Sequence, residues 1–330
     1  MKVSDYLLQA LADAGVDTCF LVFGGAMAEI MDAFPRQNRI KYVVGMHEQF
    51  CGFAAEGYAK TKGVPGFALV TSGPGLGNLI TPIQNCFYDS VPAVFVSGQV
   101  NSKFMRPSAD LRQLGFQETP SADICRPITK YAVTITKPED AVYEIQKAIH
   151  IATHGRPGPV LLDIPVDVSR AEIGNLSARP FQAEAETVGR IDGVCAGADS
   201  FINDLSTAER PGILVGGGAR LAESLIRAFA VMHKIPVFRT WNALDVVCDD
   251  SSVYAGTVGT YGGPGRNFGI QNCDVLLVLG CRLSGRITGG RPETFARGAK
   301  IYLVDVDHNL LLPEYQPRKA DVNIHCDAKE

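Results

Sequence analysis

The chain has 330 residues, enough for two ordinary α/β domains, and its 46% apolar and 20% charged residues are typical of a globular protein with a sizeable core. The net charge of −4 and the lack of a basic block argue against nucleic-acid binding and against binding to an anionic membrane surface. Apolar runs are too short to span a membrane and the start has no signal-peptide layout, so we expect a cytoplasmic protein. Nine scattered cysteines without a C-x-x-C pair predict free thiols and not a metal site.

The first part of the chain predicts alternating helices and strands. Ser4 and Asp5 are expected to cap a first helix that ends at Gly15. The strands expected after it lie at 18–23, 40–44, 67–70 and 91–97, and the helices between them at 26–34, 48–62 and 76–87. This alternation predicts a parallel sheet that is covered by helices on both faces.

A long polar stretch, residues 98–127, follows the fourth predicted strand. A loop of this length inside a compact domain is usually functional. A strand at 128–135, a helix at 141–152 and a strand at 160–164 then complete a first domain, predicted as residues 1–170. Residues 171–190 are polar, and we predict that they form a linker.

Residues 191–330 predict a second domain of the same class. The expected helices lie near 198–205 and 221–233, and the expected strands at 212–215, 237–238, 274–279 and 300–306. We therefore predict an α/β protein with two doubly wound parallel-sheet domains.

Two segments of the first domain carry candidate chemistry, each with two interpretations. The turn from Gly73 to Asn78 follows a strand and opens a helix, so its N–H groups suit an anion, but Pro74 removes one of them and spacing alone favours a plain turn. Glu48 is either a first-turn acid that faces the helix dipole or a carboxyl group in an apolar cleft that can donate a proton. His47 is a base or a core histidine.

The second domain offers a weaker signal for a nucleotide. Gly216, Gly217 and Gly218 lie between a strand and a helix, where they suit either a phosphate or a plain turn. Asp305 ends a buried strand, where it can hold a ribose hydroxyl or lie on the surface. Spacing alone therefore predicts nucleotide-compatible turns without assigning a reaction.

Several motifs, taken together in their order and spacing, resemble the thiamine-diphosphate-dependent enzymes. In the first domain they are Gly24-Gly25-Ala26, Gly45-Met46-His47-Glu48-Gln49, Ala54-Ala55-Glu56-Gly57-Tyr58-Ala59, Val70-Thr71-Ser72-Gly73-Pro74-Gly75 and Gly155-Arg156-Pro157-Gly158-Pro159-Val160. In the second domain they are Gly216-Gly217-Gly218, the run from Arg282 to Gly289 and Val304-Asp305-Val306-Asp307. The likeness covers essentially the whole chain and is greatest to the acetolactate (acetohydroxyacid) synthase large subunits.

The resemblance implies roles for residues of both domains. It implies that Glu48 is catalytic and hydrogen-bonds the aminopyrimidine ring of thiamine diphosphate. The other implied cofactor-binding residues are Gly24, Gly25, Gly73, Pro74 and Asn78. The implied substrate contacts are Phe116, Gln117, Lys130 and Arg286, of which the arginine suits the carboxylate of a second 2-keto acid. The implied flavin (FAD) or nucleotide contacts are Gly216, Gly217, Gly218, Arg282 and Asp305.

The resemblance also implies parts that this sequence does not show. In the family, a C-terminal domain with a Gly-Asp-Gly motif holds the diphosphate and its Mg²⁺, and this sequence contains no such motif. We expect no metal ligands here, and we expect a missing C-terminal part or a separate chain to supply that domain. Active sites between subunits imply a homodimer or homotetramer.

The chain departs from the family pattern at three places. Phe23 replaces the usual proline before Gly24, Thr260-Tyr261 replaces a methionine and a histidine, and Leu283-Ser284-Gly285 replaces an aromatic residue and two aspartates. The last two changes count against bound FAD and leave the acceptor substrate open.

The leading hypothesis is decarboxylation of a 2-keto acid, with pyruvate as donor, followed by carboligation. The alternatives are a carboligase with an aldehyde or keto-sugar acceptor, a simple 2-keto acid decarboxylase, and a non-catalytic nucleotide-binding partner subunit. A Rossmann-type dehydrogenase is excluded because neither domain has a G-x-G-x-x-G motif.

Overall fold

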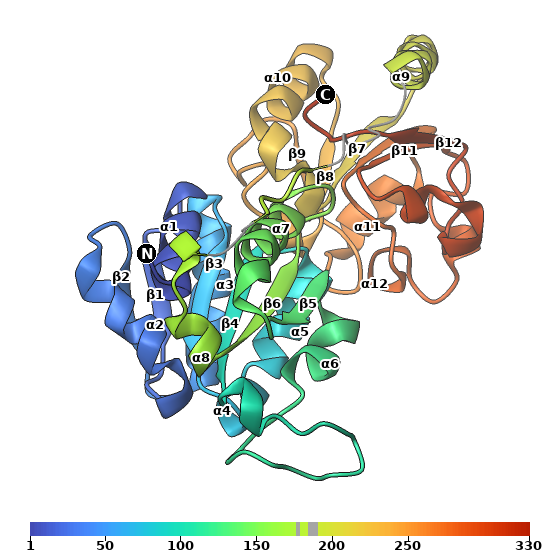
Figure 1. Ribbon diagram of the computed structural model, residues 1–330. Helices are drawn as coiled ribbons and strands as arrows, with labels where there is room; N and C mark the ends of the chain where they lie inside the picture. Colours follow the sequence, from blue (N-terminus) through green and yellow to red (C-terminus); the bar gives the residue numbers. More distant parts are fainter. Residues whose placement is uncertain (176–178, 184–190) are drawn as a thin grey trace. The chain divides into compact units, whose positions relative to one another are not determined.

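The computed structural model of the protein describes residues 1–175, 179–183 and 191–330 (Figure 1). The chain divides into two compact units, Met1–Glu184 (unit 1) and Ala185–Glu330 (unit 2). This division falls inside the predicted linker, of which residues 176–178 and 184–190 lie outside the described part. No helix among the described residues is both long enough and apolar enough to cross a membrane.

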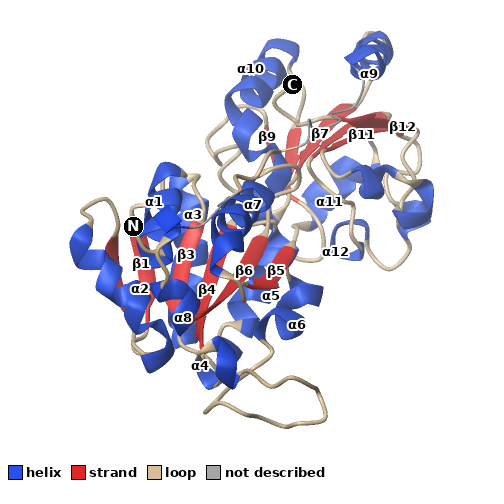
Figure 2. Cartoon of the chain, in the orientation of Figure 1, coloured by secondary structure: helices blue, strands red, loops and turns tan. Residues whose placement is uncertain are grey.

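Unit 1 is built on a sheet of six described strands, all parallel, in the order β2-β1-β3-β4-β6-β5 (Figure 2). The strands are β1 (Thr18–Leu21), β2 (Lys41–Val44), β3 (Gly66–Val70), β4 (Ala93–Gln99), β5 (Tyr131–Thr134) and β6 (Pro159–Pro165). The chain passes from β1 outward to β2 and then returns across β1 to β3. The strand order therefore reverses between β1 and β3.

Helices cover both faces of this sheet, as the alternating sequence predicts. They are α1 (Val3–Asp13), α2 (Ala28–Ala33), α3 (Glu48–Lys62), α4 (Pro74–Gly77), α5 (Ile80–Asp89), α6 (Ser121–Cys125), α7 (Ala141–Thr153) and α8 (Val166–Arg170). Phe67 and Leu69 of β3 pack into one core with α1 and α7, whereas Ala68 and Val70 pack into the other with α3 and α5. Successive side chains of a strand point to opposite faces, so one strand supplies both cores.

Two local predictions for unit 1 need correction. Lys2 is the N-cap of α1, and its N–H donates to the Asp5 carboxylate at 3.0 Å, whereas Ser4 lies inside the helix, where its buried hydroxyl has no partner among the described residues. The helix expected at 76–87 is two helices, α4 and α5, with Asn78 at the end of the first.

Unit 2 repeats the architecture with six described parallel strands in the order β12-β11-β10-β7-β8-β9. The strands are β7 (Pro211–Val215), β8 (Val237–Arg239), β9 (Tyr254–Thr257), β10 (Val275–Leu279), β11 (Lys300–Asp305) and β12 (Val322–His325). Its α-helices are α9 (Ile191–Leu205), α10 (Glu223–His233), α11 (Pro264–Gln271) and α12 (Gly285–Thr288). The predicted fold of two doubly wound α/β domains is confirmed, and the order reverses here between β7 and β10.

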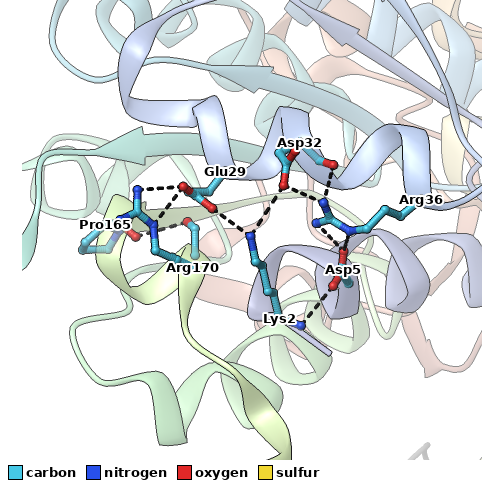
Figure 3. A network of polar contacts seen from close by, with 8 residues as sticks. Lys2, Asp5, Glu29, Asp32, Arg36, Pro165 and Arg170 are labelled. Carbon is cyan, nitrogen blue, oxygen red and sulfur yellow. Dashed lines mark hydrogen bonds and ion pairs between the residues drawn. The ribbon is translucent and has the colours of Figure 1, made fainter.

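A network of charged side chains ties α1, α2 and α8 together (Figure 3). The half-buried Glu29 carboxylate of α2 accepts hydrogen bonds from Lys2 at 3.2 Å and from Arg170 of α8 at 2.9 Å. Burial alone raises the pKa of Glu29, but the hydrogen bonds from Arg170 and Lys2 outweigh it and hold the pKa below the ordinary value of 4.5. Ionised Glu29 therefore stabilises unit 1 at neutral pH.

We predict that Glu29→Gln lowers the free energy of unfolding at pH 7 by about 1 kcal/mol. Because the folded-state pKa is depressed, this stabilisation is present above about pH 4.5 and is lost as the pH falls through the folded-state value. Urea unfolding at pH 7 and pH 3 measures the difference, with Glu139→Gln, an exposed acid, as control. An equal loss at both pH values would show that the charge of Glu29 plays no part.

Candidate functional site

The reversal of strand order in unit 1 places a candidate site at the carboxyl ends of β1 and β3. Because all strands of the sheet run parallel, the loops that follow β1 to β4 emerge at the same edge. In open α/β sheets, ligands bind in the crevice outside the carboxyl ends of the strands, where the order reverses. Gly24 follows β1, Glu48 follows β2, and the turn from Gly73 to Asn78 follows β3.

Glu48 is the first residue of α3, and a neighbouring loop holds its carboxylate. Asn78 Nδ2 donates to Glu48 Oε2 at 2.8 Å, and a methyl group added to Gly75 would lie 3.6 Å from Oε1. The Glu48 side chain is half-buried. The structure thus brings together Glu48 and Asn78, which the sequence analysis assigned to one site.

His47 is not a buried core histidine, and its ring caps a helix. It is exposed and is the N-cap of α3, where its Nδ1 accepts the Gln49 N–H at 3.2 Å. This contact satisfies one of the free N–H groups at the start of the helix. The expectation of a core histidine is therefore wrong, and the side chain fixes the helix start that carries Glu48.

Close contact between the loops after β1 and β3 explains why residues 24 and 75 are glycines. A Cβ at Gly24 would lie 2.6 Å from Thr71 Cγ2, and a Cβ at Gly75 would lie 2.9 Å from the same atom. The Thr71 hydroxyl also accepts the Ala26 N–H at 3.3 Å. The loops after β1 and β3 therefore meet at Thr71, which the sequence analysis quoted within a motif but gave no role. Gly25 faces open space, with no atom within 4 Å of a Cβ built there.

The long polar loop of unit 1 joins the same site through Gly73. This glycine has a φ of +64°, and a Cβ there would lie 2.8 Å from the Gln117 carbonyl oxygen. Gln117 itself has a φ of 56°, which is uncommon for a residue with a side chain and is found mostly where the surroundings fix it. Beneath the loop, Gln99 donates to Thr119 O at 2.7 Å and to the buried Asp163 carboxylate at 3.1 Å.

Glu118 organises the tip of this loop. Its carboxylate accepts the N–H groups of Arg106 at 2.7 Å, Leu114 at 2.9 Å and Gly115 at 3.4 Å. Burial raises the pKa of Glu118, but these hydrogen bonds outweigh it and lower the pKa overall. The ordered tip leaves the Phe116 side chain 80% exposed at the edge where Glu48 lies.

Two of the predicted substrate residues do not belong to the loops that carry Glu48 and Asn78. Lys130 precedes β5, so it lies at the amino edge of the sheet, opposite Glu48, and its ammonium group donates to the carbonyls of Ile151 and His154 at the end of α7. Arg286 belongs to α12 of unit 2, and its carbonyl accepts the Thr260 N–H at 2.8 Å. The predicted substrate contacts of both residues stay predictions.

The glycine run of unit 2 packs against the turn that follows β10. The Gly216 N–H donates to Leu279 O at 2.9 Å, and the Gly218 N–H donates to Gly280 O at 3.2 Å. A Cβ at Gly218 would lie 2.9 Å from Gly280 Cα. Two of the N–H groups predicted for a phosphate are thus already engaged, and close packing at the β7/β10 reversal explains these glycines without a nucleotide.

The other residues predicted to contact a flavin or nucleotide lie at the same edge of unit 2. Arg282 is exposed after β10, and the Asp305 carboxylate at the end of β11 accepts the Asp307 N–H at 2.9 Å. Tyr261, at the position where the sequence departs from its resemblance, contacts the Trp241 ring with centroids 5.7 Å apart. Binding of a flavin at this edge stays a prediction.

The chain matches known proteins over both units. Residues 1–124 match the family described as thiamine pyrophosphate enzyme, N-terminal TPP binding domain, and residues 199–330 match thiamine pyrophosphate enzyme, central domain. The chain therefore belongs to the thiamine pyrophosphate enzymes, of which it carries these two domains. The resemblance inferred from the sequence motifs is confirmed.

The similar curated proteins are acetolactate synthases. Acetolactate synthase 2, chloroplastic, from Brassica napus is 34% identical over 329 residues, which are 99% of this chain and 50% of that protein. The probable acetolactate synthase large subunit of Methanocaldococcus jannaschii is 35% identical over 100% of this chain and 54% of that protein. The acetolactate synthase large subunit of Corynebacterium glutamicum is 34% identical over 91% of this chain and 47% of that protein. The chain spans about half the length of the curated relatives that it matches.

The residues at the β1/β3 reversal fit the aminopyrimidine half of thiamine diphosphate. The backbone at Gly25 carries no side chain that would keep a ring away and the space beside it is open, whereas Thr71 fills the position that a Cβ of Gly24 would take. The Glu48 carboxylate, held by Asn78, supplies a group that can exchange a proton with a ring nitrogen. Both features lie within unit 1.

We predict that Gly24→Ala lowers the free energy of unfolding by roughly 1–3 kcal/mol, because its Cβ would overlap Thr71 at the base of the site. Gly25→Ala is the matched control and should change it by less than about 0.5 kcal/mol, because a Cβ there has no neighbour within 4 Å. Urea unfolding of the two variants measures the difference. Equal effects would contradict the close contact between the loops after β1 and β3.

Proposed function

We propose that this chain supplies the pyrimidine-binding part of an active site that decarboxylates a 2-keto acid, with pyruvate as donor, and joins the product to a second carbonyl compound. The observation that carries the proposal is the Glu48–Asn78 pair at the strand-order reversal of unit 1. The same reaction class is supported by relatives that are named acetolactate synthases and that match essentially the whole chain. The proposed enzyme is thus a transferase of the acetolactate synthase type.

Each residue of the site has a proposed task. Glu48 holds a proton at the pyrimidine ring nitrogen, and Asn78 orients its carboxylate for that contact. Gly25 lets the backbone approach the ring, and Gly24 lets the loop after β1 pack on Thr71 beside it. When bound, thiamine diphosphate supplies the carbon nucleophile and the electron sink for decarboxylation.

The long loop has a proposed task as well. Gln117 is fixed against Gly73, and the exposed Phe116 ring stands beside it at the same edge. We assign both to contact with the substrate and to the exclusion of water, which protects a reactive carbon nucleophile from protonation.

Exposed apolar side chains beside Glu48 support a partner surface. Met46, in the turn before Glu48, is 98% exposed, and the further exposed apolar residues after β1, on β2 and on α3 are Phe23, Tyr42, Val43, Val44, Phe50 and Phe53. Proteins rarely expose large apolar patches unless another surface binds them. We propose that a diphosphate-binding domain with its Mg²⁺, from elsewhere in the protein or from a separate chain, covers this patch. A homodimer or homotetramer is part of the proposal.

The remaining alternatives differ in how the structure bears on them. An aldehyde or keto-sugar acceptor, or decarboxylation alone, uses the same site in unit 1 and stays an alternative. The Glu48–Asn78 pair favours catalysis over a non-catalytic nucleotide-binding role, for which this acid has no use. The engaged N–H groups of Gly216 and Gly218 count against FAD, so the proposal includes no flavin step.

The cytoplasmic location stays a prediction. The names of the plant relatives place those proteins in the chloroplast.

We predict that Glu48→Gln in the complete protein slows proton exchange at the thiazolium carbon of added thiamine diphosphate by about 100-fold or more, because the amide cannot exchange a proton with the ring. Hydrogen–deuterium exchange followed by NMR measures the rate, with Glu139→Gln as control. Asn78→Ala should give a smaller loss, because the carboxylate remains but loses its 2.8 Å hydrogen bond. Normal exchange in Glu48→Gln would overturn the role of Glu48.

Product analysis from pyruvate tests the reaction class. The complete protein, with thiamine diphosphate and Mg²⁺, should form acetolactate and carbon dioxide, because decarboxylation is followed by addition to a second pyruvate. If acetaldehyde formed in place of acetolactate, the reaction would be decarboxylation without carboligation. If turnover began only after another carbonyl compound was added, that compound and not pyruvate would be the acceptor.

A further inference from the structure

A groove of about 910 Å³ opens at the amino edge of the unit 2 sheet, and we call it the amino-edge groove. Pro211 opens β7, Pro236 directly precedes β8, and both line the groove. Because the strands are parallel, this edge is opposite the one that carries Gly216 and Arg286. From this edge the groove continues along β8 and β9 to the start of α11 at Gly263–Arg266, and its volume lies in the range of small-molecule sites.

The wall of the groove is apolar, and helix α11 lies close to it. Phe238 of β8 and Cys273 contribute to the wall, together with Pro211 and Pro236. A Cβ at Gly269 of α11 would lie 3.2 Å from the Phe238 ring, so this glycine lets the helix approach the strand. Asn272 also lines the groove, and its side chain donates to Phe268 O at 2.7 Å. An apolar body fits against the apolar part of the wall because both surfaces then leave water.

Three cations from three separate segments line the groove. Arg210 precedes β7, Lys234 follows α10 and Arg266 belongs to α11. Glu209 pairs with Arg210 at 3.0 Å, so the lining side chains carry an excess of two positive charges. The nearby Asp274 carboxylate accepts the backbone N–H groups of Glu209 and Arg210. The structure gives the side chains of Lys234 and Arg266 no hydrogen bond or ion pair among the described residues.

The backbone around two of these cations is in conformations that favour glycine. Lys234 ends α10 with a φ of 55°, in the left-handed conformation that glycine ordinarily supplies at this position. Gly256 of β9 has a φ of +116°, and a Cβ there would overlap the Arg266 side chain, which therefore crosses the strand at this glycine. A lysine in this conformation has a local backbone cost that glycine would not have.

We propose that the amino-edge groove binds an amphipathic anion, a carboxylate or sulfonate on an apolar body. The anionic head binds between Lys234 and Arg266. The guanidinium group of Arg266 can donate two parallel hydrogen bonds to it. The apolar body lies against the wall formed by the prolines and Phe238. The acid at the groove, Glu209, is already paired with Arg210, so the site favours an anion over a zwitterion. This site goes beyond the proposed reaction and does not depend on it.

A fluorescence titration of the 330-residue chain with 1-anilinonaphthalene-8-sulfonate tests the proposal. The probe should bind saturably, octanoate should displace it, and 1-octanol, which has the same chain length without the charge, should not. Lys234→Gly and Arg266→Gln should each weaken the probe's affinity at least five-fold. Arg297→Gln, an exposed cation of unit 2 away from the groove, is the matched control and should leave it unchanged.

The lysine variant separates binding from folding. Lys234→Gly relieves the left-handed backbone, so its melting temperature should equal or exceed that of the unaltered chain while its affinity falls. Unchanged affinity in both Lys234→Gly and Arg266→Gln would place the probe on other exposed apolar surface and overturn the proposal. Equal displacement by octanoate and 1-octanol would overturn it as well, because the head group would then contribute nothing.

Discussion

The parallel direction of every strand in unit 1 is the constraint on which its candidate site depends. Parallel strands deliver all their following loops to one edge, and the reversal between β1 and β3 opens that edge, because the helices that follow these two strands, α2 and α5, pack on opposite faces of the sheet. Glu48, Asn78 and Gly24 come from three different loops, yet the topology leaves them no other edge to occupy. The same rule separates Lys130 from Glu48, and it separates the amino-edge groove of unit 2 from the glycine turns.

Steric fit and buried hydrogen bonds hold these loops in place. Thr71 fills the space that two glycines leave, and Gln117 rests on Gly73. Beneath them, burial raises the pKa of the Asp163 carboxyl, while hydrogen bonds from Ser97 and Gln99 oppose that shift. A site that must hold a carboxylate in one orientation is more precise on such a packed base than on a free loop.

Much of the fold follows from local sequence. Alternating helical and apolar segments predict the α/β class, and α3 has the predicted bounds of 48–62 because Gly63 ends it in the left-handed conformation. The edge strands β9 and β12 escaped prediction because their sequences, Tyr254-Ala255-Gly256-Thr257 and Val322-Asn323-Ile324-His325, contain no run of three apolar residues, whereas the equally short edge strand β2 does. Contacts distant in sequence escaped as well: spacing cannot show that Gly218 packs on Gly280, or that Thr71 lies between Gly24 and Gly75.

The central claim is that Glu48 contacts the pyrimidine ring of thiamine diphosphate at the β1/β3 reversal. A crystal structure of the complete protein with thiamine diphosphate and Mg²⁺ tests it most directly. The account predicts a ring nitrogen within hydrogen-bond distance of the Glu48 carboxylate, with the ring beside the backbone of Gly24 and Gly25. A pyrimidine ring bound elsewhere, with Glu48 still bonded only to Asn78, would contradict it.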